Sequence, residues 1–109
     1  MLVLRTIKHW GSKYPWVVQV RASLKEGLEQ SIIDAIDKGQ PPALALSQDK
    51  AAFEFCRELL ETKQVSDATY RQTVDSLGEA GVVDIVATIG LFTTTALTAN
   101  AFAIDPPKD

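Results

Sequence analysis

The hydrophobic positions of this 109-residue chain recur at helical spacing, which predicts a protein built from helices. The longest weakly polar run is 81–104, GVVDIVATIGLFTTTALTANAFAI, and it carries no charge between Ile85 and Ile104. Its length would suffice to cross a membrane. However, threonines and Asn100 interrupt it, and no positive cluster flanks it to set an orientation. We therefore expect a helix buried on most sides within a protein core, and no membrane partner.

Shorter helical patterns precede this run. Their ends are marked by glycines, which accept the left-handed backbone that often closes a helix. Residues 1–9 read as the end of a helix without a capping residue, and a short strand is the alternative. Ser47 and Ser66 are expected N-caps, and Gly78 is an expected helix end. The spacing predicts further helices over 16–26, 28–38, 47–63 and 66–78.

Composition limits the classes of function. The chain is 46% hydrophobic and 23% charged, as one globular domain would be, and its net charge of -3 argues against nucleic acid as a partner. The single Cys56 excludes an intrachain disulfide and a CxxC redox or zinc motif. We expect no cofactor and no metal. A reducing cytoplasm is the expected location, because the N-terminus lacks a signal-peptide pattern.

Few side chains in the sequence are reactive. Cys56 lies on the apolar stripe of its predicted helix, where a free cysteine behaves as a small hydrophobe. His9 is the only histidine and is expected in a surface turn near a helix end. Asn100 lies deep in the apolar run and would need hydrogen-bond partners if it were buried, so we expect it to tie two backbones together.

Three stretches carry a family pattern. The first is LVLRTIKHWGSKYPWVVQVRASLKEGL, followed by the connector and helix AIDKGQPPALALSQDKAAFEFC. The last is RELLETKQVSDATYRQTVDSLGEAGVVDIVATIGLFTTTALTANAF, which contains VSDATY and ends in asparagine, alanine and phenylalanine. Over nearly the whole chain, they resemble the carboxymuconolactone decarboxylase family of the alkylhydroperoxidase D-like superfamily. The resemblance implies an all-α, alkylhydroperoxidase D-like bundle of about five to six helices.

The same resemblance places a site on the first stretch. In redox-active relatives, a CxxC motif with a histidine four residues later forms the centre, and an upstream glutamate completes a proton relay. Aligned on GS.Y.W, the two cysteines and the histidine correspond to Ser12, Pro15 and Gln19. The glutamate would precede Met1, so we expect residues 1–109 to form a single domain that lacks the family's N-terminal helices. A peroxidase-like function is the weakest possibility, because the CxxC motif is missing.

Two other functions follow from the resemblance. The first is a decarboxylase-like lyase that acts on a small lactone or carboxylic acid by acid/base chemistry. Its candidate catalytic residues are Gln19 and His9, and Tyr14 and Trp16 would line the substrate pocket. Decarboxylase-like relatives carry a glutamate and a histidine near Pro15 and Gln19. Both are absent here, and a neighbouring subunit would have to supply the missing groups. Gln19 cannot carry a proton at neutral pH.

The alternative is a non-catalytic family member whose main property is self-assembly. In that case Tyr14 and Trp16 serve as core or interface residues. Its expected partner is a second copy of the chain, in a homo-oligomer that would be a trimer or a hexamer.

Overall fold

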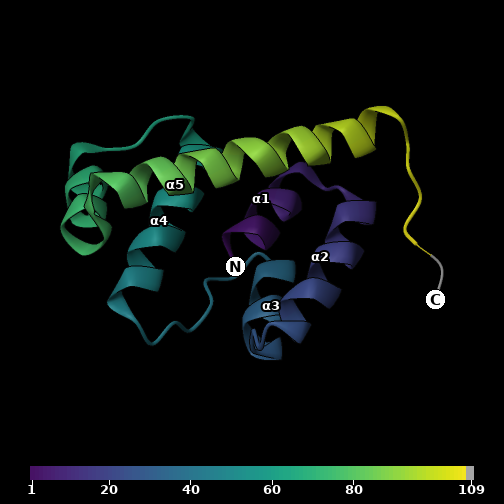
Figure 1. Cartoon of the computed structure of the whole chain (residues 1–109), viewed down its shortest axis with the longest axis horizontal. Helices are drawn as coiled ribbons and strands as arrows, with labels where there is room; N and C mark the ends of the chain where they lie inside the picture. The colour runs from purple at the N-terminus through teal and green to yellow at the C-terminus, as the bar shows by residue number, and fades with distance from the viewer. Residues whose placement is uncertain (108–109) are drawn as a thin grey trace.

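The computed structural model describes residues 1–107, which form five helices and no strand (Figure 1). The expected all-α class with about five to six helices is confirmed. The alternative of a strand at the N-terminus is wrong, because α1 begins at Leu2. The helices are α1 (Leu2–Trp10), α2 (Lys13–Lys25), α3 (Gln30–Asp37), α4 (Ser47–Thr62) and α5 (Asp67–Ala101).

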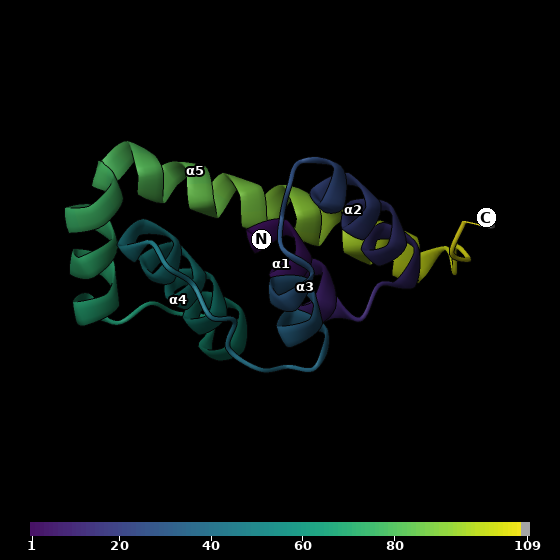
Figure 2. The same cartoon turned by 90° about the horizontal axis from the view of Figure 1, so that it is seen from below.

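Helix α5 bends sharply at Gly78 and therefore comprises two helical segments. Gly78 has φ 75° and ψ 170°, a backbone conformation that is open almost only to glycine. Figures 1 and 2 show the short first segment turning into the long second one. The sequence expectation that a helix ends at Gly78 is thus confirmed, and a new helix starts at once without a loop.

The first segment of α5 begins at a capped N-terminus. The Ser66 hydroxyl accepts a hydrogen bond of 3.3 Å from the Thr69 backbone N–H, as expected for an N-cap. Glu58 on α4 supports the same turn, because its carboxylate accepts hydrogen bonds from the Ser66 N–H and, at 2.6 Å, from the Thr69 hydroxyl. Ser47, by contrast, is the first residue of α4 and makes no cap bond.

The long second segment of α5 lies along one edge of the molecule in both views, with α1, α2 and α4 packed against it (Figures 1 and 2). Apolar side chains of α4 and α5 form one buried cluster and those of α1, α3 and α4 form another. The first consists of Ala52, Phe55, Cys56, Leu60, Val82, Ile85 and Ile89, and the second of Leu4, Ile33, Ile36 and Phe53.

Only one face of α5 is covered. Of its most apolar window, with mean hydropathy 1.7, 22% is buried, so the expectation of a helix buried on most sides is wrong for the single chain. Val83 and Leu91 are 65% and 62% exposed on the opposite face. By length and composition, α5 is also the one helix among the described residues that could cross a membrane. Its uncovered face is a property that the sequence alone did not disclose.

Candidate functional site

The turn between α1 and α2 carries the positions that correspond to the family's site. Gly11 closes α1 with φ 64° and ψ 31°, and its N–H and that of Ser12 bond to the carbonyl oxygens of Lys8 and Ile7. Ser12 is buried, and its hydroxyl donates a hydrogen bond of 3.3 Å to the Ala96 carbonyl oxygen on α5. This bond occupies the hydroxyl and fixes the turn against the long helix.

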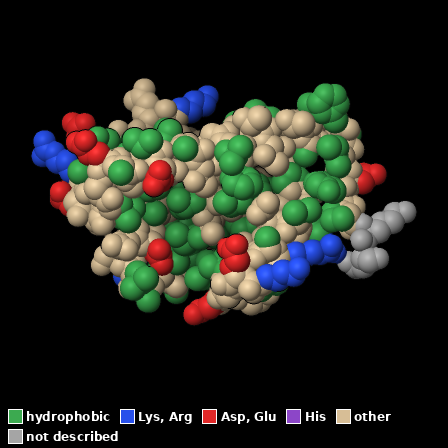
Figure 3. Space-filling view, in the orientation of Figure 1, with side chains coloured by type: hydrophobic (Ala, Val, Ile, Leu, Met, Phe, Trp, Pro, Cys, Tyr) green, Lys and Arg blue, Asp and Glu red, His purple; other side chains and the backbone are tan. Residues whose placement is uncertain are grey.

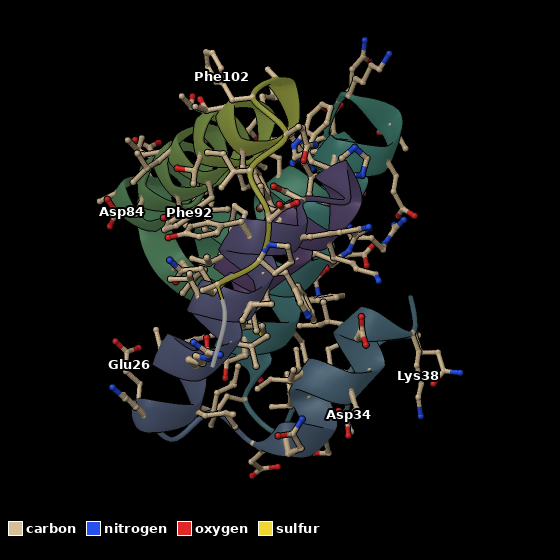
Figure 4. The ribbon with its side chains drawn as sticks, turned by 90° about the vertical axis from the view of Figure 1, so that its right-hand side faces the viewer. Glu26, Asp34, Lys38, Asp84, Phe92 and Phe102 are labelled. Carbon is tan, nitrogen blue, oxygen red and sulfur yellow. The ribbon has the colours of Figure 1, made fainter. Side chains whose placement is uncertain are left out.

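A cavity of about 380 Å³ opens beside this turn. Its walls come from both helices of the turn, from the end of α3 and from the segment after α5. Figure 4 shows that segment running past α1 and α2 after it leaves the end of α5. The lining residues are Ile7, Lys8, Gly11, Ser12, Lys13, Trp16, Val17, Asp37 and Pro106.

The charged groups of this cavity lie next to its aromatic wall. The Lys8 ammonium donates a hydrogen bond of 3.0 Å to the Asp37 carboxylate. It also lies 5.7 Å from the centroid of the Trp16 ring, within the range of a cation–π contact. The cavity therefore combines an apolar surface with an ammonium group that could bind an anionic ligand and a carboxylate that could accept a proton.

His9 lies in a different cavity, of about 420 Å³, on the other side of Lys8. Its ring contacts Trp10 edge-on, with 4.9 Å between ring centroids. Burial and, to a smaller extent, the positive charge of Arg5 lower the pKa of His9, while Glu61 opposes the shift. The neutral imidazole is thus favoured, at a position that does not line the Trp16 cavity.

The structure does not gather the four sequence-predicted site residues around one cavity. Trp16 lines the cavity beside Ser12, and His9 lines the second one. Tyr14 is exposed and Gln19 is half-buried, and neither lines the Trp16 cavity or the His9 cavity. The catalytic roles of His9 and Gln19 and the substrate-binding roles of Tyr14 and Trp16 stay predictions.

Two cavity residues were missed by the sequence analysis. Lys8 and Asp37 are separated by 29 residues and belong to different helices, so no local motif links them. The only signal in the sequence is that each is a charged residue next to an apolar helical position. Their pairing depends on how α3 packs against α1.

The only thiol is not part of either cavity. Cys56 is completely buried, and its sulfur lies 3.8 Å from the Thr6 hydroxyl. Burial raises the pKa of the Cys56 thiol, although the Thr6 contact and Arg5 act in the opposite direction. A protonated, inaccessible thiol is a poor nucleophile. The interpretation of Cys56 as a core residue is confirmed.

Comparison with known proteins identifies the fold. No family model and no curated protein matches the sequence. A crystal structure of a protein of unknown function from Agrobacterium tumefaciens, described as a candidate antioxidant defence protein AhpD, superposes with a TM-score of 0.87. The two chains are 17% identical, and the alignment covers 99% of this chain and 75% of that one. The chain thus has an AhpD-like fold, as the resemblance implied.

Proposed function

We propose that this AhpD-like protein binds a small carboxylic acid or lactone in the Trp16 cavity. The observation that carries the proposal is the position of the Lys8 ammonium, 3.0 Å from Asp37 and 5.7 Å from the Trp16 ring, in the wall of a cavity of about 380 Å³. Small-molecule sites are commonly concave and mostly apolar, with a few polar groups that fix the ligand's orientation. The resemblance to carboxymuconolactone decarboxylases favours the same class of ligand.

The ligand's apolar body would lie against Trp16 and Val17, which come from adjacent positions of α2. Its carboxylate would accept a hydrogen bond from the Lys8 ammonium, which can donate three. Lys13 supplies a second positive charge in the same wall. Asp37 then faces the ligand as the one carboxylate that lines this cavity.

A decarboxylase-like reaction would need a group that takes up and returns a proton. In this cavity, Asp37 is the candidate base and Lys8 is the candidate electrostatic clamp for the carboxylate. We propose lactone or carboxylic acid turnover by this pair as the catalytic form of the function. Asp37→Asn should then abolish turnover and leave ligand binding in place.

Binding can be measured by calorimetry with a panel of small carboxylic acids and their neutral lactones. Lys8→Met should weaken the binding of the acids about tenfold or more, which corresponds to one lost charge-assisted hydrogen bond, and should affect the neutral lactones less. Lys50→Met, at an exposed position on α4, is the matched control. If the two variants bind acids equally well, the proposed site is wrong.

Turnover is a separate measurement, in which nuclear magnetic resonance follows the loss of lactone or of carboxylate. Binding without turnover would support a ligand-binding function and contradict the proposed lyase activity. Absence of binding across the panel would contradict both forms of the proposal.

We propose self-assembly as a second property, because the uncovered side of α5 exposes large apolar residues such as Val83 and Leu91. Apolar surface of this kind commonly marks a protein–protein contact. Light scattering over a range of concentrations tests it. A trimer or hexamer is the expected size from the family resemblance, and a monomer throughout would contradict it.

A further inference from the structure

The second segment of α5 presents an uncharged stripe to solvent, opposite to its buried side. Members of this α5 stripe recur at each turn of the helix, three or four residues apart and in some turns as adjacent pairs, so they share one broad face. Figure 3 shows hydrophobic side chains gathered along the right-hand half of this helix. The stripe consists of Val83, Val86, Ala87, Gly90, Leu91, Thr94, Leu97 and Thr98, all of them exposed.

The hydroxyls of the two threonines in the stripe are already satisfied within the helix. Thr94 donates to the Gly90 carbonyl oxygen at 3.1 Å, and Thr98 donates to that of Thr94 at 2.8 Å. Thr88 and Thr95, beside the stripe, make the same bond one turn back. Burying a polar group is costly only when it loses its hydrogen bonds. The α5 stripe can therefore be covered by another apolar surface without leaving a hydroxyl unpaired.

Gly90 lies in the middle of the stripe without an intramolecular reason for being glycine. Its backbone is helical, and an added Cβ would meet no atom within 4 Å. Glycine inside a helix costs about 1 kcal/mol relative to alanine. A missing side chain at the centre of an exposed apolar stripe allows the backbone of a second helix to approach closely. This use would account for the glycine.

We infer that two copies of this chain pack α5 against α5 in antiparallel orientation, with Gly90 at the two-fold axis. In that arrangement Val83 faces Leu97 of the partner subunit, since each is seven residues from Gly90. Val86 likewise faces Thr94 of the partner subunit. A two-fold contact is self-complementary, and it occurs in dimers and in hexamers made from two trimers, so it fits the expected hexamer and excludes an isolated trimer. The inference rests on the proposed self-assembly and specifies its surface.

The charges at the borders of the stripe favour the antiparallel arrangement. Asp84 lies near the start of the second segment and Phe102 directly follows its end, and both side chains point away from the body of the molecule (Figure 4). A parallel pair would place two Asp84 carboxylates side by side. In the antiparallel pair, they lie about 18 Å apart along the axis, at 1.5 Å per residue. This separation exceeds the Debye length of about 8 Å at physiological salt, so their repulsion is largely screened.

The same charges argue for a second copy and against a lipid surface. Asp84 and Asp105 border the apolar run, and no lysine or arginine lies between Ile85 and Ile104. Anionic membrane surfaces attract basic segments, and surface-bound amphipathic helices typically carry lysine and arginine on their polar face. The acidic border of the α5 stripe would not be attracted to an anionic membrane surface, and it lacks the basic residues of a surface-bound helix. An identical uncharged stripe has no such conflict.

The size of the stripe sets the strength of the contact. From Val83 to Leu97 the helix is about 22 Å long and, with side chains, about 10 Å wide. One helix pair of that size covers less than the roughly 800 Å² per partner of a standard stable interface. The contact alone is therefore expected to give micromolar association, and tighter assembly would need a further surface.

Analytical ultracentrifugation of the full chain tests the contact. Leu91→Glu should weaken association about tenfold or more, because two unpaired charges would enter the interface. Leu46→Glu is the matched control, since Leu46 is also 62% exposed but precedes α4. Circular dichroism of both variants verifies that they remain folded. Equal association constants for both variants would overturn the α5 contact.

Disulfide trapping tests the orientation, in a Cys56→Ala background that removes the natural thiol. Mixing Val86→Cys protein with Thr94→Cys protein should give a cross-linked heterodimer under mild oxidation, because facing positions come within disulfide range. Val86→Cys alone should cross-link much less, because its two copies lie about 12 Å apart along the axis. Cross-linked Val86→Cys homodimers, with no Val86→Cys/Thr94→Cys heterodimer in the mixture, would overturn the antiparallel register.

The outcomes separate this inference from the proposal on which it rests. If the oligomer persists in Leu91→Glu and no cross-link forms, self-assembly is supported but the α5 stripe is not its contact surface. If the wild type is a monomer at all concentrations, both the proposed self-assembly and the α5 contact are wrong. A monomer that sediments with anionic vesicles, and stops doing so in Leu91→Glu, assigns the stripe to a membrane and overturns the inference.

Discussion

The Asn100 side chain donates a hydrogen bond of 2.8 Å from Nδ2 to the main-chain carbonyl oxygen of Trp10. This bond joins the end of α5 to the last residue of α1, across a separation of 90 positions. The Trp10 indole N–H reinforces it by donating to the Thr93 hydroxyl at 3.1 Å. Asn100 thus has the structural role that the sequence suggested, although the residue is exposed.

Removing this bond should lower stability by a modest amount. Asn100→Ala is expected to reduce the free energy of unfolding by about 1 kcal/mol, the usual net value of one hydrogen bond. Urea denaturation monitored by tryptophan fluorescence measures it. Thr95→Ala, whose hydroxyl bonds only within its own helix, is the control and should change stability by less than about 0.5 kcal/mol. Equal losses in both variants would contradict the role given to Asn100.

Gly78 and Gly90 should respond in opposite ways to alanine. Gly78→Ala forces a side chain onto a residue with φ 75° and should cost about 1–3 kcal/mol of unfolding free energy. Gly90→Ala occupies open space in a helical backbone and should stabilise the monomer by about 1 kcal/mol. Chemical denaturation at submicromolar concentration compares them. A stabilised Gly78→Ala variant would contradict the positive-φ backbone conformation of Gly78 and the bend that it produces.

The buried thiol should make stability depend on alkaline pH. Because burial raises the pKa of Cys56 in the folded chain, folding retains a proton that the unfolded chain loses. The stability contribution is full below the ordinary thiol pKa of about 8.5 and decreases as the pH rises above it. Urea denaturation between pH 7 and pH 10 should show this decrease in the wild type and a smaller one in Cys56→Ala. If the free energy of unfolding of both proteins changes equally with pH, the Cys56 thiol does not cause the decrease.

His9 should titrate below the ordinary histidine value of about 6.5. It is the only histidine, so its imidazole protons give one resolvable set of signals in nuclear magnetic resonance. Because Arg5 lowers the pKa of His9 and Glu61 raises it, Arg5→Gln should move the midpoint up and Glu61→Gln should move it down. Arg21→Gln, on α2, serves as the charge control. A midpoint that responds equally to Arg5→Gln and Arg21→Gln would contradict the proximity of Arg5.

Much of the local structure was predictable because it depends on neighbouring residues. Gly11 and Gly78 break helices through their own backbone freedom, and Ser66 caps a helix through a bond to Thr69, three positions away. Cys56 follows the apolar spacing of α4 into the core. The expected ends of α2 and α4 differ from the observed ends by a few residues at most. Lys13 starts α2 earlier than expected, because Pro15 fits in a first helical turn.

The candidate site was less predictable, because its members are brought together by packing. The resemblance drew attention to the turn at Ser12 and to Trp16, and both line the cavity. It grouped His9 with Trp16, whereas the two side chains line separate cavities. The pairing of Lys8 with Asp37 follows from the placement of α3 against α1, which no local pattern encodes.

The sequence by itself determined that the chain is helical, where most helices end and that its closing run is apolar. These properties follow from side-chain spacing and from backbone freedom within a few residues. Only the tertiary structure decided which side of that run is covered, because α5 is apolar on both sides and its sequence favours neither. The helices that pack on Ile85 and Ile89 leave Val83 and Leu91 exposed, and this packing produces the uncovered α5 stripe.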